Sequence, residues 1–132
     1  MTNEERDSLV KIRFEQAEEA YDAASILINN QKYISAISRI YYSMFNAVTA
    51  LAIRNGFETS KHARLLGWFN KEFIHTGLLD VKFSQIVRDA FDRRTKADYD
   101  TIPVPPVATI EQMLKEARLF IDEMKKFINE SA

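Results

Sequence analysis

The residues best suited to chemistry lie between Arg94 and Tyr99, just before a proline-rich segment. This stretch combines an arginine with a carboxylate at Asp98 and a phenol at Tyr99, and Arg93 adds a second cation. A guanidinium can hold a phosphate through its planar fork of N–H donors, and Asp98 or Tyr99 would then move a proton or contact a nucleotide. A purely structural interpretation also accounts for the arginines, because cations near the C-terminal end of a helix interact favourably with its dipole.

A second basic group surrounds His62, which lies between Lys61 and Arg64. The group stands at the predicted start of a helix, where free backbone N–H groups favour anions. Lys61 and His62 are therefore candidate phosphate contacts, and an ordinary solvated histidine is the alternative. His75 is too far along the chain to form a metal pair with His62, and the chain has no cysteine. We expect neither a metal site nor a cofactor.

Size and composition indicate one globular domain spanning residues 1–132. Eighteen basic against nineteen acidic residues give a net charge of −1, so RNA binding would need a local basic patch. No stretch approaches the roughly 18 apolar residues of a membrane span, and the first residues contain no apolar signal region. We therefore expect a cytoplasmic protein without a membrane partner.

Apolar residues at alternating spacings of four and three predict amphipathic helices, and no run alternates with the period of a strand. The predicted helices cover about residues 4–30, 32–55, 61–75 and 81–97, followed by a last helix that begins near Thr109. The second helix carries two apolar stripes and should be the most buried, so its Tyr41–Tyr42 pair is interpreted as core or interface packing. We expect an all-α fold, an antiparallel up-and-down bundle of four to five helices.

Glycines and prolines mark the predicted ends of these helices. Gly56 and Gly77 suit positions just past a helix, where the backbone often turns left-handed. The segment 103–106 contains three prolines and cannot continue a helix. Ser60 is the predicted cap of the third helix, and Thr109 begins a predicted capping box for the last one.

Together these features resemble the HEPN (higher eukaryotes and prokaryotes nucleotide-binding) family, and most of all its small bacterial and archaeal members. The resemblance covers nearly the whole chain, and the order and spacing of its four segments are fairly specific. Family members are helical bundles that tend to form homodimers, which the resemblance implies here as well. The four segments are Arg39–Phe45, Gly56 with Lys61 and His62, Phe69–Phe73 with Gly77, and Arg94–Tyr99.

The resemblance also implies an activity and a partner. Many HEPN proteins are metal-independent ribonucleases, in which two copies form one RNA cleft and the ribose 2′-hydroxyl attacks its own phosphate. An arginine stabilises the developing charge, and a histidine four to six residues later handles protons. Many prokaryotic members are toxins encoded beside a minimal nucleotidyltransferase antitoxin. In some pairs, the antitoxin adds AMP to a tyrosine just past that histidine.

This sequence departs from that signature at the histidine. The residues five positions after Arg93 and Arg94 are Asp98 and Tyr99, and no histidine follows. An aspartate is ionised at neutral pH and adds negative charge near a phosphate, and a tyrosine is a poor base. Ribonuclease activity is therefore an open question for this chain.

Two functions follow from the resemblance. In the first, the chain is the toxin-like member of a pair with a minimal nucleotidyltransferase. Arg94 then contacts RNA or nucleotide phosphate, Asp98 orients it, and Tyr99 is a contact or an AMP acceptor, with His62 as a substitute catalyst if it folds near Arg94. In the second, the chain is a non-catalytic HEPN module for nucleotide binding or homodimeric scaffolding. An adjacent gene for a short nucleotidyltransferase would favour the first function.

Overall fold

The computed structural model describes residues 1–98 and 103–130, and these residues form helices without any strand. The all-α prediction is therefore confirmed. In chain order the elements are α1 (Asn3–Asn29), α2 (Tyr33–Arg54), α3 (His62–Phe69), a π-helical segment (Asn70–Ile74), α4 (Val81–Ala97) and α5 (Val107–Glu130).

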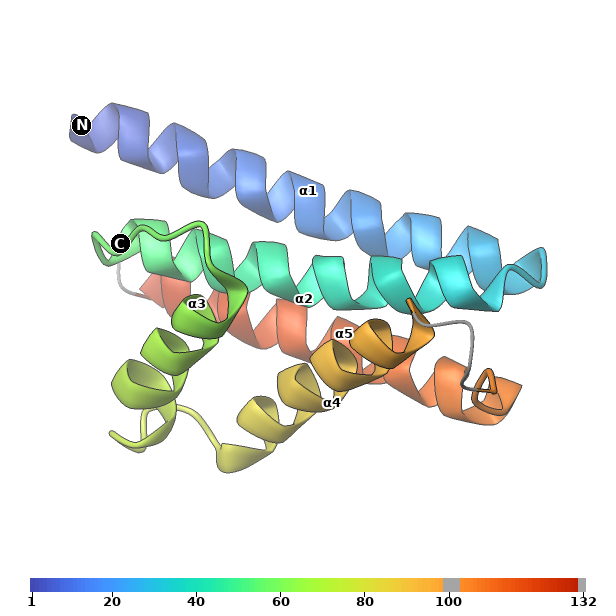
Figure 1. The fold of residues 1–132 in the computed structure, drawn as a ribbon. Coiled ribbons are helices and arrows are strands. Elements are labelled where there is room, and N and C mark those ends of the chain that lie inside the picture. Colours follow the sequence, from blue (N-terminus) through green and yellow to red (C-terminus); the bar gives the residue numbers. More distant parts are fainter. Residues whose placement is uncertain (99–102, 131–132) are drawn as a thin grey trace.

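The three long helices α1, α2 and α5 lie along one another, and α3 and α4 form a V against them (Figure 1). α1 and α2 are antiparallel, and α5 lies beside α2 and runs in the same direction as α2 (Figure 1). α2 is the central helix, since it contacts α1, α3, α4 and α5. Both chain ends lie at the same end of the bundle, opposite the turn between α1 and α2 (Figure 1).

The core forms around α2, as its two apolar stripes predict. Eleven of the 22 residues of α2 are buried, which is possible because apolar side chains face two sides of the helix. Phe120 of α5 is fully buried against the rings of Phe69 and Phe83, and thereby joins α3 and α4 to the long helices. Burying one such side chain contributes roughly 1.5–3 kcal/mol, so this cluster fixes where α3 and α4 lie.

Several helix ends follow the sequence signals. The hydroxyl of Thr2 accepts a hydrogen bond from the backbone N–H of Glu5 at 3.1 Å and caps α1, and the carboxylate of Asp80 caps α4 in the same way. Gly56 and Gly77 have φ values of 77° and 80°, in the left-handed region that suits glycine after a helix.

Two cap predictions are wrong. Lys61, rather than Ser60, occupies the cap position of α3, and its side chain makes no capping hydrogen bond. α5 begins at Val107, where the N–H of Thr109 already donates to the carbonyl of Pro106 at 2.9 Å, so Thr109 is not the cap. The physical reason is that a proline has the φ value a helix needs and no N–H to leave unpaired, so a helix starts readily beside it.

The third helix also differs from its prediction. It is α-helical only to Phe69, and residues 70–74 widen into a π-helical turn in which the N–H of His75 donates to the carbonyl of Asn70 at 2.8 Å. The extra residue in the turn keeps Phe73 buried, where its ring contacts Phe69 and Phe127. A wider turn of this kind leaves the apolar pattern nearly unchanged, so the periodicity could not reveal it.

The connections bring three segments that are distant in sequence to one place. The loop after α2 turns back, so that α3 starts beside the middle of α2 (Figure 1). α4 then runs from the tip of the V back towards α2 (Figure 1). The start of α3 and the end of α4 consequently meet on one side of α2, and the polar residues predicted at both places lie there.

Candidate phosphate-binding site

Arg94, near the end of α4, reaches the surface of α2. Its Nη2 atom donates a hydrogen bond to the hydroxyl of Tyr42 at 3.0 Å. Its guanidinium carbon lies 5.2 Å from the centre of the Tyr42 ring and 5.7 Å from that of Tyr41, within the range of cation–π attraction. Two tyrosines of α2 therefore hold this cation in place without neutralising its charge.

Among the described residues, the one carboxylate within ion-pair distance of Arg94 is that of Asp98, one helical turn further on. Its Oδ2 atom lies 3.4 Å from Nε of Arg94, while the Asp98 side chain remains 56% exposed. Nε is buried and makes no hydrogen bond to any described residue. An exposed pair at this spacing contributes only a few tenths of a kcal/mol, so Arg94 is weakly paired and keeps N–H donors for another acceptor.

His62, the first residue of α3, lies beside the same tyrosines. Its Nδ1 atom is 2.9 Å from the hydroxyl of Tyr41, and its ring stacks on Phe45 with the ring centres 4.1 Å apart. The edge of Tyr42 meets the same imidazole, with 6.1 Å between centres. His62 and Arg94 thus contact the same pair of tyrosines, so the structure brings together the two candidates that the sequence could not relate.

The environment of His62 fixes its protonation. Loss of solvent around the half-buried ring and the positive charge of Arg94 both lower the pKa of His62, which makes the neutral ring the main form at neutral pH. Burial raises the pKa of the Tyr41 hydroxyl far above its ordinary value, so Tyr41 keeps its proton and can donate to Nδ1 or accept from it. In the tautomer that accepts from Tyr41 at Nδ1, the proton of the neutral imidazole lies on Nε2.

The other predicted site residues are distributed around this centre. Lys61 is exposed next to His62, where it adds a cation at the start of α3. Arg93 lies on a different face of α4 and lines a separate hollow with Asp89 and Asp92. Successive residues of a helix point about 100° apart, so Arg93 and Arg94 cannot serve one contact. Tyr99, predicted as a contact and modification site, lies outside the described residues.

The sequence interpretation missed the role of the tyrosine pair. Tyr41 is fully buried, as predicted, but its hydroxyl also meets His62, and the hydroxyl of Tyr42 meets Arg94. The available signal was the need of a buried tyrosine hydroxyl for a polar partner. Arg39, the first residue of the segment Arg39–Phe45, also contacts this pair, because its guanidinium carbon lies 5.6 Å from the centre of the Tyr42 ring.

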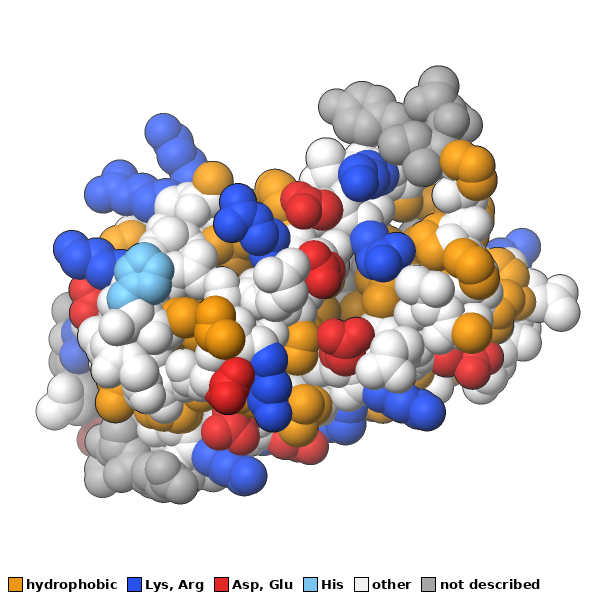
Figure 2. All heavy atoms as spheres, turned by 90° about the horizontal axis from the view of Figure 1, so that it is seen from below, with side chains coloured by type: hydrophobic (Ala, Val, Ile, Leu, Met, Phe, Trp, Pro, Cys, Tyr) orange, Lys and Arg blue, Asp and Glu red, His pale blue; other side chains and the backbone are white. Residues whose placement is uncertain are grey.

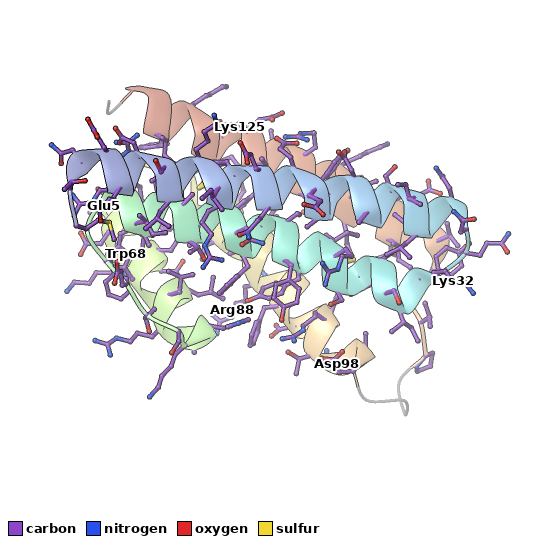
Figure 3. All side chains as sticks on the ribbon, turned by 90° about the horizontal axis from the view of Figure 1, so that it is seen from above. Glu5, Lys32, Trp68, Arg88, Asp98 and Lys125 are labelled. Carbon is purple, nitrogen blue, oxygen red and sulfur yellow. The ribbon has the colours of Figure 1, made fainter. Side chains whose placement is uncertain are left out.

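The surface between α3 and the end of α4 is hollowed and carries charged side chains of both signs (Figure 2). Seen from the side of α3 and α4, the molecule is hollowed between α3 and the end of α4, and Lys and Arg side chains stand on both sides (Figure 2). Asp98 projects at the end of α4, on the opposite side of α1 and α2 from Lys125 of α5 (Figure 3). Guanidinium, imidazole Nε2–H and ammonium groups are all donors, so this arrangement is suited to an anion such as a phosphate.

Known proteins resemble this chain over most of its length. The model of the HEPN domain matches residues 10–128, which include all of α2, α3 and α4 and most of α1 and α5. The chain belongs to the HEPN family. A Methanocaldococcus jannaschii protein named "Putative toxin MJ0142" is 37% identical over 86% of this chain and 78% of its own length.

Two further relatives align with most of this HEPN chain. A second M. jannaschii protein, named "Putative toxin MJ0605", is 33% identical over 96% of this chain and 91% of its own. A "UPF0332 protein" of Thermotoga maritima is 29% identical and covers 96% of both chains. Two relatives named as toxins therefore align with most of this chain.

The described residues contain neither a cluster of metal ligands nor a membrane-spanning helix. No set of three or more His, Cys, Asp or Glu side chains in this part of the HEPN protein is grouped as metal ligands would be. None of the described helices is long and apolar enough to cross a membrane.

Proposed function

We propose that this HEPN protein is the toxin-like member of a toxin–antitoxin pair and binds RNA or nucleotide phosphate at Arg94. The observation that carries the proposal is a guanidinium held by Tyr42, weakly paired with Asp98 and adjacent to His62. A cation that is fixed in position but not neutralised is the arrangement that phosphate recognition requires. The toxin names of two relatives support the toxin-like role.

Binding is better supported than cleavage. In HEPN-type cleavage the 2′-oxygen bonds to phosphorus, the bond to the 5′-oxygen breaks, one proton leaves the 2′-hydroxyl and another reaches the 5′-oxygen. Arg94 is placed to stabilise the phosphate charge. The lowered pKa of His62 leaves little imidazolium to act as an acid, and the hydrogen bond between Nδ1 and Tyr41 leaves only Nε2 for proton transfer. Any ribonuclease activity of this chain should therefore be slow.

The proposed partners are a minimal nucleotidyltransferase antitoxin and a second copy of the chain. In this proposal Tyr99, which follows Asp98 in the sequence, accepts AMP from the nucleotidyltransferase. The modification is tested by coexpressing the two proteins and measuring the mass of the HEPN chain. An added AMP that is lost in Tyr99→Phe supports this part of the proposal, and an unchanged mass in the wild type contradicts it.

The phosphate site is tested with labelled single-stranded RNA in EDTA, followed by both binding and cleavage. Arg94→Ala should weaken binding roughly tenfold or more, because a charge-assisted contact is lost. Arg93→Ala is the matched control, since it removes the same charge one residue away on another face of α4. Equal binding by the wild type and both variants would refute a phosphate site at Arg94.

The alternative is a non-catalytic HEPN module. The observation that favours it is the engagement of His62 with Tyr41, together with the missing histidine after Arg94. RNA binding that depends on Arg94 without cleavage would indicate a binding module. A dimer that persists in Arg94→Ala while no RNA binds to the wild type would indicate a scaffold.

A further inference from the structure

The basic side chains of this protein fall into two groups by their partners. Arg54, Arg118 and Lys125 each form an ion pair with a carboxylate of another helix or of α5 itself. Arg39 and Arg13, by contrast, have no carboxylate within ion-pair distance among the described residues. Arg13 instead donates to two neutral amides, at 3.4 Å to Gln16 and 3.3 Å to Asn46. No ion pair with a described residue therefore neutralises Arg13 or Arg39.

Arg13 and Arg39 line one hollow between α1 and α2. Its volume is about 380 Å³, and Asn46 also lines it, with Glu19 as the one acidic side chain. Arg39, Tyr42 and Asn46 stand three and four residues apart and so share one face of α2. Tyr42, which accepts a hydrogen bond from Arg94, therefore lies on the same face of α2 as the two residues that line the hollow.

Contacts between side chains join the hollow at Arg13 and Arg39 to the site at Arg94. The guanidinium of Arg39 lies 5.6 Å from the centre of the Tyr42 ring, whose hydroxyl accepts the hydrogen bond from Arg94. The side chain of Asn46 donates to the carbonyl of Tyr42 at 2.9 Å and accepts from Arg13. A line of guanidinium groups thus runs from α4 across α2 to α1.

We propose that this line is a track for single-stranded RNA, in which Arg39 and Arg13 contact phosphates of nucleotides next to the one held at Arg94. The inference rests on the proposed phosphate site and extends it to the class of nucleic acid. A single strand can lay its backbone into a hollow between two packed helices, whose axes are only about 8–10 Å apart. A duplex is too wide to enter it. Electrostatic contacts to the backbone also need no particular base sequence.

The test measures binding of a labelled oligouridine of roughly twelve nucleotides, a length within the range of single-strand sites on small domains. Uridine monophosphate serves as the short probe. Arg39→Ala and Arg13→Ala should each weaken binding of the long probe about threefold and leave the short probe unchanged. Each should also reduce the slope of log affinity against log salt by roughly 0.7, the value for one lost phosphate contact.

Three controls separate the possible results. Lys115→Ala removes an exposed charge from α5 and should leave both probes unchanged. Arg39→Lys keeps a cation and should retain the wild-type salt slope, and circular dichroism verifies that every variant keeps its helices. A blunt duplex of the same length should bind more weakly and be insensitive to Arg39→Ala.

The outcomes distinguish the track from the phosphate site. Loss of binding in Arg94→Ala, with Arg39→Ala and Arg13→Ala indistinguishable from Lys115→Ala, would overturn the track and leave the site at Arg94. No binding of either probe by the wild type would overturn both. Equal binding of the duplex, with equal sensitivity to Arg39→Ala, would overturn the assignment to single strands.

Discussion

Two charged clusters on this molecule use the same residue types in opposite ways. On the α1–α5 side, Glu18 receives two hydrogen bonds from Arg118, at 2.7 and 2.8 Å, and an ion pair from Lys125. On the α2–α4 side, Arg94 has a tyrosine hydroxyl and one loosely placed carboxylate. The first cluster satisfies its charges internally and joins two helices. The second leaves positive charge available, which a phosphate can use.

The pKa values express the same contrast. The hydrogen bonds from Arg118, with the charges of Arg118 and Lys125, outweigh burial and lower the pKa of Glu18 from 4.5 to about 2. At the other cluster, loss of solvent and the charge of Arg94 lower the pKa of His62. Charge is balanced at the first cluster and left unbalanced at the second.

The largest expected effect on stability comes from breaking the balanced cluster. Glu18→Gln should lower the free energy of unfolding by roughly 1–3 kcal/mol, because Lys125 loses its carboxylate and Arg118 keeps only that of Asp122. Urea denaturation measures this change. RNA binding should stay at the wild-type level. A loss of RNA binding in a folded Glu18→Gln variant would contradict the separation of the two clusters.

The pH dependence of this effect has a definite sign. Since the pKa of Glu18 is depressed in the folded state, its contribution is present above about 4.5 and is lost as pH falls towards about 2. The stability difference between the wild type and Glu18→Gln should therefore shrink through that window. Unfolding at a series of acidic pH values follows it.

A smaller effect is expected when Arg94 is removed. Arg94→Ala should change the free energy of unfolding by less than about 1 kcal/mol, because its ion pair is exposed and weak. It should also raise the pKa of His62, since one of the two causes of the lowered value disappears. Titration of the imidazole by NMR measures the shift. An unchanged pKa would show that His62 does not feel the charge of Arg94.

The smallest expected effect concerns Asp98. Asp98→Asn removes the carboxylate that competes with phosphate for Arg94, so RNA binding should tighten roughly twofold, in line with the value of an exposed pair. Fluorescence anisotropy at low salt would detect it. A weaker affinity instead would support the role that the sequence interpretation gave Asp98, which is to orient the phosphate.

Most of the fold could be predicted from the sequence. The stripe of Val10, Ala17 and Ala24 in α1 is buried as its spacing indicates, and both stripes of α2 face the core. The caps of α3 and α5 were wrong because short polar residues such as Ser60 and Thr109 suit several positions around a helix start. Helix-capping preferences rank such residues, but they do not decide which of several neighbouring positions is the cap.

The site could be predicted only in part. Arg94 and His62 were recognisable as polar groups at helix ends, because that inference needs only the local sequence. Arg93 was included for the same reason, and only the direction of each side chain from α4 separates it from Arg94. The roles of Tyr42 and Arg39 were not visible, since an aromatic residue beside an arginine in a helix is ordinary packing until a third segment meets it.

The sequence by itself determined the helices, the buried faces and the family, because these depend on periodicity and on short motifs that a single chain carries. Only the tertiary structure decided that α3 and α4 bring His62 and Arg94 to the same two tyrosines, while Glu18 of α1 meets the cations of α5. The physical reason is that charge balance depends on distances of a few ångströms between side chains far apart in the sequence. Those distances are set by how the core packs.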